Sequence, residues 1–250
     1  MRSLSRKEIR AVDRCAIERL GVPGAVLMEN AGRNAADAIA EFLGGAGDRS
    51  VAVVAGAGNN GGDGFVIARH LSMRGARVTT FLAAPADKVA GEALVNLEIL
   101  RRAGCDVQEV TGEALAGLGE KLASFDVVVD AIGGTGISGE LRGDAAVAVE
   151  QVNAAGRRVV AVDIPTGLDC DTGQAAGPTV KADMTVTFAA QKRGFEADSA
   201  SNYTGRVVLA DIGVDMETVL GLMPTGLTEC PEAQLRKKAE LSTDVNSTLS

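Results

Sequence analysis

The sequence has few of the side chains on which several common functions depend. Its 250 residues include no tryptophan, one tyrosine and one histidine, His70. A platform that stacks nucleic-acid bases needs aromatic side chains, and a histidine zinc site or a Ser-His-Asp triad would have to use His70. We therefore expect none of these sites. His70 falls late in a predicted helix, so we expect it to be packed or to lie at the helix C-terminus.

Cysteine pairs and long apolar runs are also missing. The four cysteines form no Cys-x-x-Cys pair, which indicates reduced thiols and not a disulfide framework. No apolar run is long enough to cross a bilayer, and the N-terminal segment carries charges within its apolar pattern, unlike a signal peptide. These features predict a cytoplasmic protein. The cysteines are Cys15, Cys105, Cys170 and Cys230.

Positive charge is in deficit, since the formal net charge is -8. Nucleic acids and anionic membrane surfaces bind clustered lysine and arginine, so we expect neither as a partner. An anionic small molecule remains compatible with this charge, because backbone N–H groups bind anions without any net positive charge.

The chain does contain a regular alternation of apolar segments. Ser5 and Glu8, at capping-box spacing, begin a predicted helix over 5–20, and a second helix follows over 26–43. Short β-branched runs then alternate with helical segments, which is typical of a parallel sheet covered on both faces. We expect one α/β domain over 1–215. The predicted strands are 51–56, 77–84, 107–110, 126–134, 158–164, 184–190 and 207–214.

From Met216 onward the apolar periodicity is lost. We therefore predict that residues 216–250 form a poorly ordered C-terminal tail that the domain does not need in order to fold.

The segment GAGNNGGDGF, residues 56–65, comes close to a dinucleotide-binding fingerprint. Gly56, Gly58 and Gly61 satisfy G-x-G-x-x-G between a predicted strand and a predicted helix. The fingerprint also requires a carboxylate at the end of the next strand to hold a ribose, and the nearest one, Asp87, lies well past that point. The segment has no Gly-Lys-Ser/Thr, so it is not a P-loop either. Binding of NAD as an ordinary cofactor is therefore disfavoured.

The same segment has the chemistry of an anion site. Backbone N–H groups at a helix N-terminus favour phosphate, and Asn59, Asn60 and Asp63 add polar side chains. A plainer alternative is that Asp63 caps the helix and the asparagines occupy turn positions. Two further predicted strands end in Asp130 and Asp163, each followed by a glycine-rich segment. Since ligands bind at the carboxyl ends of strands in an open parallel sheet, we predict a site at this edge.

These segments resemble a known family. GAGNNGGDGFVIARHL, VVVDAIGGTGISG, VAVDIPTGLDCDTG and ADMTVTFAAQKRGF, with the leading segment that ends in LMENAGRNAA, are similar to the NAD(P)H-hydrate epimerase family, the YjeF N-terminal domain. The likeness covers about residues 5–214. It implies a Rossmann-like three-layer αβα sandwich with a mainly parallel central sheet and two leading N-terminal helices, usually dimeric.

The resemblance also implies an activity. The family interconverts the R and S epimers of hydrated NADH and NADPH (NADHX and NADPHX), a repair step that feeds an S-specific dehydratase. The dinucleotide would then be a damaged substrate and not a cofactor. The dehydratase domain would have to be a separate partner protein for this chain.

The resemblance carries over to individual residues. It implies one potassium ion per subunit, held by Asn60, Asp130 and Thr166, whose oxygens suit a hard cation. Many relatives have Phe where this chain has Gly133, and Ser where it has Thr166. The implied substrate contacts are Asp163 and two loops, Asn59, Asn60, Gly61, Gly62 and Asp63, and Gly134, Thr135, Gly136, Ile137, Ser138, Gly139 and Glu140.

The chemistry of the substrate identifies candidate catalytic residues. Hydration places a hydroxyl beside the ring nitrogen, and its loss and return need one group that gives and takes a proton. Asp163, at a strand end in a glycine-rich segment, is the first candidate. Lys192 could assist the proton transfer or hold a phosphate, although a lysine beside Arg193 in a loop is often a solvated charge.

Two other functions stay in consideration. A noncatalytic interaction or ligand-binding module of the same fold is disfavoured because Asn60, Asp130 and Asp163 are all present. An NAD-dependent oxidoreductase is disfavoured because the ribose-binding carboxylate is missing.

Overall fold

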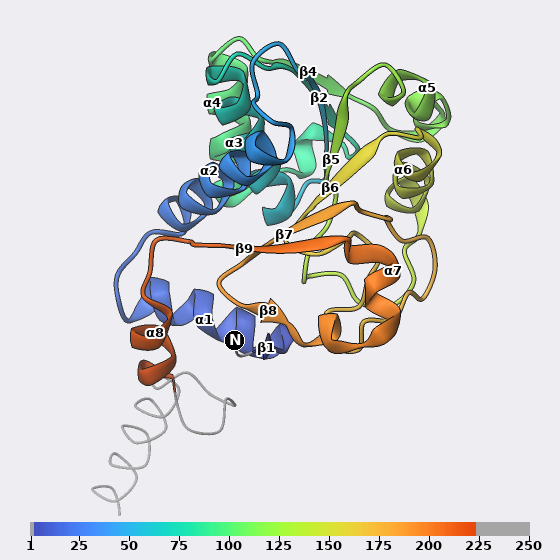
Figure 1. The fold of residues 1–250 in the computed structure, drawn as a ribbon. Helices are drawn as coiled ribbons and strands as arrows, with labels where there is room; N and C mark the ends of the chain where they lie inside the picture. Colours follow the sequence, from blue (N-terminus) through green and yellow to red (C-terminus); the bar gives the residue numbers. More distant parts are fainter. Residues whose placement is uncertain (1–2, 224–250) are drawn as a thin grey trace, which may run out of the picture.

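The structure, a computed structural model, describes residues 3–223. Its centre is a seven-stranded sheet in the order β4-β3-β2-β5-β6-β7-β9, and every pair of neighbouring strands in it is parallel (Figure 1). The seven strands predicted from the sequence are all confirmed, with their ends shifted by a few residues. They are β2 (Ser50–Ala55), β3 (Arg77–Leu82), β4 (Asp106–Glu109), β5 (Val127–Ala131), β6 (Arg158–Val162), β7 (Met184–Phe188) and β9 (Arg206–Ala210).

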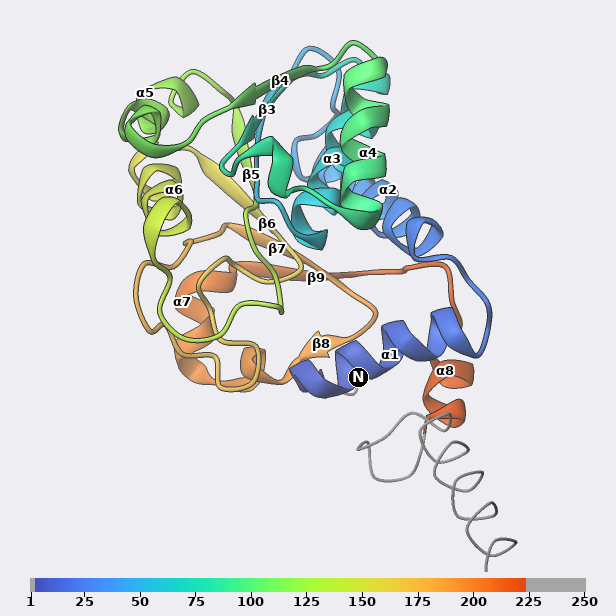
Figure 2. The same cartoon turned by 180° about the vertical axis from the view of Figure 1, so that it is seen from behind.

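Helices cover both faces of the sheet, which confirms the three-layer αβα fold (Figures 1 and 2). Strand β2 shows why the sheet needs a layer of helices on each of its faces. Val51, Val53 and Ala55 belong to one hydrophobic core, while Ala52 and Val54 point into another. The first core lies under α2 (Gly24–Phe42), α3 (Asn59–Met73) and α4 (Gly91–Arg102), and the second under α5 (Leu118–Leu122) and α6 (Gly143–Ala154).

Helix α3 lies unusually close to the sheet. A Cβ added to Gly64 would come within 2.6 Å of the Cβ of Ala131, at the end of β5. Glycine at this position therefore lets the first turns of α3 rest against the strand ends. His70, near the end of the same helix, lies with Nε2 2.7 Å from Oε1 of Glu29 of α2, as expected for a packed histidine. The described cysteines, Cys15, Cys105 and Cys170, form no disulfide with one another, and Cys230 lies outside the described residues.

The N-terminal segment is joined to a distant part of the chain. Strand β1 (Ser3–Leu4) pairs in parallel with β8 (Gln191–Lys192), so that Leu4 lies opposite Lys192. Helix α1 (Arg6–Glu18) follows at once, with Ser5 as its N-cap in a capping box with Glu8, as the sequence predicts. Figure 2 shows α1 beside β8, away from the helices that cover the sheet.

Short helical turns complete the described chain, and none of its helices is both long and apolar enough to cross a membrane. These turns are η1 (Ala86–Lys88), η2 (Gly112–Gly117), η3 (Arg193–Glu196), η4 (Asp198–Ala200), α7 (Ser201–Thr204) and α8 (Met216–Leu222).

Helix α8 corrects the predicted domain boundary. The expectation that order ends near Met216 is wrong, because Asp215 caps α8 by accepting a hydrogen bond from the Thr218 N–H, and Val219 is fully buried in the main core. The Cys15 Sγ of α1 also contacts the Val219 carbonyl at 3.7 Å. A seven-residue helix is too short to produce a recognisable apolar period. The rest of the predicted tail, 224–250, lies outside the described residues.

Replacing Val219 with alanine should lower the free energy of unfolding by about 2 kcal/mol, because two buried methyl groups are removed and a cavity remains. Urea unfolding of the full chain measures this loss. Leu222→Ala on the same helix is the matched control, since Leu222 is 39% exposed and its removal should cost far less. Equal costs for the two variants would show that α8 does not pack as described.

Candidate active site

A cavity of about 580 Å³ opens at the carboxyl ends of the central strands, where the sequence predicts a site. Its wall combines α1, α2 and the first turns of α3 with the segments that follow β5, β6 and β7. The predicted site residues that line it are Asn59, Asn60, Asp63, Gly134, Thr135, Gly136, Ile137, Asp163 and Lys192.

Lys192 and Asp163 form an ion pair in this wall. The Lys192 Nζ lies 2.6 Å from Asp163 Oδ1, and the Lys192 side chain is fully buried while that of Asp163 is 14% exposed. The same Nζ donates hydrogen bonds to the carbonyls of Phe188 (3.1 Å) and Ala190 (3.5 Å). The three donors of the ammonium group therefore all have acceptors. The alternative that Lys192 is a solvated loop charge is wrong.

Two tight backbone turns create this arrangement at the ends of neighbouring strands. Asp163, after β6, has φ of 68°, and Ala189, after β7, has φ of 62°. In each case the following N–H donates to the preceding carbonyl, Ile164 to Val162 at 2.8 Å and Ala190 to Phe188 at 2.7 Å. Such γ-turns with positive φ are rare and cost roughly 1–3 kcal/mol at a residue with a side chain. Both strained residues, Asp163 and Ala189, line the cavity.

The two turns position the groups that contact one another in the Lys192–Asp163 ion pair. The turn at Ala189 brings the Phe188 and Ala190 carbonyls around the Lys192 Nζ. At Asp163, Oδ1 faces Lys192 while Oδ2 accepts a hydrogen bond from the Thr135 N–H at 3.1 Å. Asp163 is therefore held from two sides, and it links the segment after β6 to the segment after β5.

Asp130 and Thr166 form a second buried link between the segments that follow β5 and β6. The Thr166 N–H and hydroxyl donate to the two Asp130 oxygens at 2.9 and 2.7 Å, and the Ile132 N–H donates at 3.2 Å. Burial raises the pKa of Asp130 to about 6, although these hydrogen bonds act to lower it. Both side chains are completely buried behind the described wall of the cavity.

Asn60 is a buried residue of the cavity wall. Its residue is 8% exposed, and within residues 3–223 neither atom of its amide group has a hydrogen-bond partner. An unpartnered buried amide is costly, so its presence points to a ligand or an ion. Asn60 Oδ1 and Asp163 Oδ2 lie 3.3 and 2.7 Å from the position that a Cβ on Gly134 would take. Glycine at 134 thus leaves room between an amide oxygen and a carboxylate.

Asp63 does not cap helix α3. The N-cap of α3 is Gly58, the two asparagines are helical, and Asp63 lies beyond the first turn, lining the cavity. Burial, followed by the charges of Asp163 and Asp13, raises its pKa well above the usual value, while Lys192 acts in the opposite direction. The alternative of a helix cap with asparagines in turn positions is therefore wrong.

Asp13 of α1 is a cavity residue that the sequence analysis missed. Its side chain lies at the exposed rim, yet desolvation by the surrounding protein, helped by the charge of Asp163, raises its pKa to about 6, with Lys192 opposing. The local pattern around Asp13 is that of an ordinary amphipathic helix. The pairing of β1 with β8 helps to bring α1 to the site, and a contact between such distant segments leaves no local signal.

The two predicted substrate loops are only partly at the cavity. Gly61 and Gly62 are buried inside the first turns of α3. In the second loop Ser138, Gly139 and Glu140 are exposed, and they do not belong to the described cavity wall. The space that a side chain on Gly133 would fill is already occupied by Ile137, whose Cδ1 contacts that position. Ile137 thus provides apolar packing beside Gly133.

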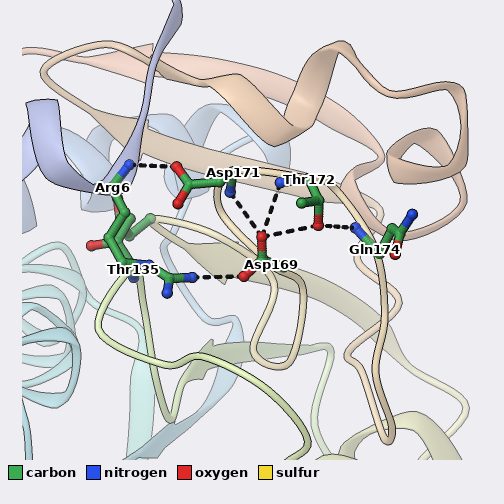
Figure 3. Close-up of polar contacts among 7 residues, drawn as sticks. Arg6, Thr135, Asp169, Asp171, Thr172 and Gln174 are labelled. Carbon is green, nitrogen blue, oxygen red and sulfur yellow. Dashed lines mark hydrogen bonds and ion pairs between the residues drawn. The ribbon is translucent and has the colours of Figure 1, made fainter.

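A polar network fixes α1 to the site (Figure 3). Arg6 donates from its guanidinium to Asp169 and from its N–H to Asp171, both at 2.8 Å. Asp169 also accepts from the backbone of Asp171 and from the backbone and hydroxyl of Thr172. Although partial burial acts to raise it, these bonds hold the pKa of Asp169 below its usual value. A second tie joins Glu8 of α1 to Arg193 at 2.7 Å.

Comparison with known proteins decides the family. The sequence model of the family described as YjeF-related protein N-terminus matches residues 24–194. The chain belongs to this family. Helix α1 and its Asp13 precede the matched residues of the YjeF-related N-terminus, whereas Lys192 falls just inside them.

Several relatives in the family are similar over most of the chain. An NAD(P)H-hydrate epimerase of Rhodopirellula baltica is 44% identical over 212 residues, which cover 84% of each chain. One of Pirellula staleyi is 42% identical, covering 85% of this chain and 93% of the other. A bifunctional NAD(P)H-hydrate repair enzyme Nnr of Moorella thermoacetica is 42% identical, but the match covers 40% of that protein. The crystal structure of the yeast protein ynu0 superposes with a TM-score of 0.69 at 27% identity, covering 78% and 84% of the two chains.

Replacing Lys192 with methionine should lower the free energy of unfolding by about 3 kcal/mol, since it leaves Asp163 without its cation and two carbonyls without a donor. Chemical denaturation measures the loss. Lys181→Met is the control, because the Lys181 side chain is exposed and its replacement should change stability by less than about 0.5 kcal/mol. A cost for Lys192→Met as small as that of the control would contradict the buried ion pair.

Proposed function

We propose that this protein is an NAD(P)H-hydrate epimerase, which interconverts the R and S epimers of NADHX and NADPHX. The observation that carries the proposal is the buried Lys192–Asp163 pair facing a cavity beside the unpartnered amide of Asn60. The chain that holds this site is 44% identical to a named epimerase over most of both lengths. A noncatalytic module of the same fold would have no reason to keep a strained, charged cavity wall.

The reaction follows from the carbinolamine in the substrate. The hydroxyl sits on a carbon beside the ring nitrogen, whose lone pair can expel it as water once an acid has protonated it. The resulting iminium carbon is planar, so water can return to either face. Asp163 is the proposed proton-transfer group, and Lys192 and the Thr135 N–H hold its two oxygens in place. The negative charge of the carboxylates would stabilise the cationic intermediate.

The rest of the cavity suits a dinucleotide. The N-terminus of α3, with Asn59 and Asn60, offers backbone N–H groups to a diphosphate, and Gly134 to Ile137 form the opposite wall. The matched part of the bifunctional repair enzyme is 40% of its length, and we propose that a separate S-specific dehydratase consumes the S epimer made by this chain.

Assembly and location remain predictions. We propose a homodimer, and the exposed apolar side chains of Leu94, Val95 and Ile99 on α4 provide surface that a second subunit could cover. The cytoplasmic location, like the expectation that neither nucleic acid nor membrane is a partner, stays a prediction.

We also propose that one potassium ion binds at Asn60, Asp130 and Thr166. The residues fit such an ion, because Asn60 Oδ1 has no described partner and Asp130 is a completely buried carboxylate that a cation would neutralise. When bound, the ion would supply a fixed positive charge next to the cavity. Asp130 and Thr166 already hold the two loops together, and Asn60 would extend that link to α3.

A coupled assay tests the activity. Purified protein added to the mixed epimers with an S-specific dehydratase should speed the consumption of the R epimer above the spontaneous rate. Asp163→Asn should lower kcat and kcat/KM together by about 10²–10⁴, because the amide cannot donate and recover a proton. Asp87→Asn is the control, since Asp87 is exposed in η1 and is not part of the described cavity wall. If Asp163→Asn raised KM and spared kcat, Asp163 would bind substrate only.

Potassium should stabilise the protein more than sodium at equal ionic strength. If the ion is present at about ten times its Kd, the gain is about 1.4 kcal/mol and the melting temperature should rise by about 3–6 °C. Asp130→Asn should abolish the difference between the two salts, whereas Thr166→Ser, which keeps the hydroxyl, should preserve it. Identical melting curves of the unmodified protein in both salts would exclude the ion site.

A further inference from the structure

The cavity has carboxylates on more than one wall. Asp163 follows β6 at the sheet edge, Asp63 belongs to α3, and Asp13 belongs to α1, which lies outside the layers of the sheet (Figures 1 and 2). An epimerisation needs a proton donor where the hydroxyl leaves and a proton acceptor where water returns, and these events occur on opposite faces of the ring. A single carboxylate would have to serve both faces.

Helix α1 is held rigidly as part of the site. Its N-terminus is fixed by the pairing of Leu4 with Lys192, by the Arg6–Asp169 ion pair and by the Glu8–Arg193 ion pair. Three of its residues, Ile9, Asp13 and Ile17, recur at helical spacing along the cavity. Asp13 therefore has a fixed position in the cavity and is not on a loosely attached surface helix.

The charges around Asp13 suit a group that gives and takes a proton. It lines the cavity together with Asp163, Asp63 and Lys192 and interacts with them electrostatically, and Arg10, one turn earlier on α1, also lines the cavity. Lys192 forms its ion pair with Asp163, and within residues 3–223 no ion pair is described for Asp13. With its pKa raised to about 6, the Asp13 carboxyl exists in both protonation states near neutral pH.

We propose that Asp13 is a second catalytic acid–base residue, acting on the face of the nicotinamide ring opposite to the face served by Asp163. This inference rests on the proposed epimerase function. In one direction protonated Asp13 gives its proton to the hydroxyl, the C–O bond breaks, water leaves and the ring nitrogen lone pair forms the C=N bond. On the other face a water forms the new C–O bond while Asp163 accepts its proton. Exchange with solvent resets both carboxyls, and the reverse reaction exchanges their roles.

Isotope exchange separates the two faces. Each pure epimer is incubated with enzyme in H₂¹⁸O, and both conversion and ¹⁸O incorporation into unconverted substrate are followed, with the spontaneous rates subtracted. Asp13→Asn should lower conversion by about 10²–10⁴. The epimer whose hydroxyl faces Asp163 should still exchange its oxygen, because Asp163 can remove and return water on its own face. Asp163→Asn should show the same behaviour with the other epimer.

Two control variants complete the experiment. Asp13→Glu, which keeps a carboxyl, should retain most of the conversion, and Glu18→Gln, an exposed carboxylate on the same helix that is not part of the described cavity wall, should convert normally. Near-normal conversion by Asp13→Asn would overturn the proposal, and so would an equal loss of conversion and exchange with both epimers, which indicates a structural role. If the unmodified enzyme failed to convert either epimer, the proposed function would be wrong.

Discussion

The site depends on the placement of one buried cation, the ammonium group of Lys192. A fully buried lysine is stable only if its charge and its donors are matched, and here Asp163 and two carbonyls provide that match. Supplying the carbonyls requires the chain to turn sharply at Ala189, and presenting the carboxylate requires a similar turn at Asp163. The strained backbone at two strand ends is thus explained by a single electrostatic requirement.

The Lys192–Asp163 pair also connects the parts of the chain that form the cavity wall. Asp163 joins the segment after β6 to Thr135 after β5, and the Asp130–Thr166 link repeats that connection deeper in the protein. Lys192 in turn is paired with the N-terminal strand, which carries α1 to the cavity. Substrate, protonating groups and the proposed ion site would therefore share one connected framework, in which a change at one element shifts the others.

Much of the fold was accessible from the sequence, because its signals are local. Alternating β-branched strands and helices predicted the parallel sheet, Ser5 and Glu8 predicted the start of α1, and polar strand ends indicated the edge of the sheet where the cavity opens. What could not be predicted arises from contacts between distant residues. Nothing near Lys192 shows that its strand will pair with Leu4, and Asp13 lies in an ordinary amphipathic helix. Helix α8 was missed because one buried residue, Val219, is too little to form a pattern.

The pairing of β1 with β8 has a consequence for how the protein folds during synthesis. Leu4 and Lys192, which lie far apart in the sequence, must meet before β1 and β8 can pair, and closing so long a loop is entropically costly. During synthesis the β1 segment emerges first, so it must wait for nearly the whole domain to leave the ribosome before it finds its neighbour. A partly made or partly folded chain could hold most of the sheet and still lack a competent cavity. A competent cavity would then appear only once β1 and β8 have paired.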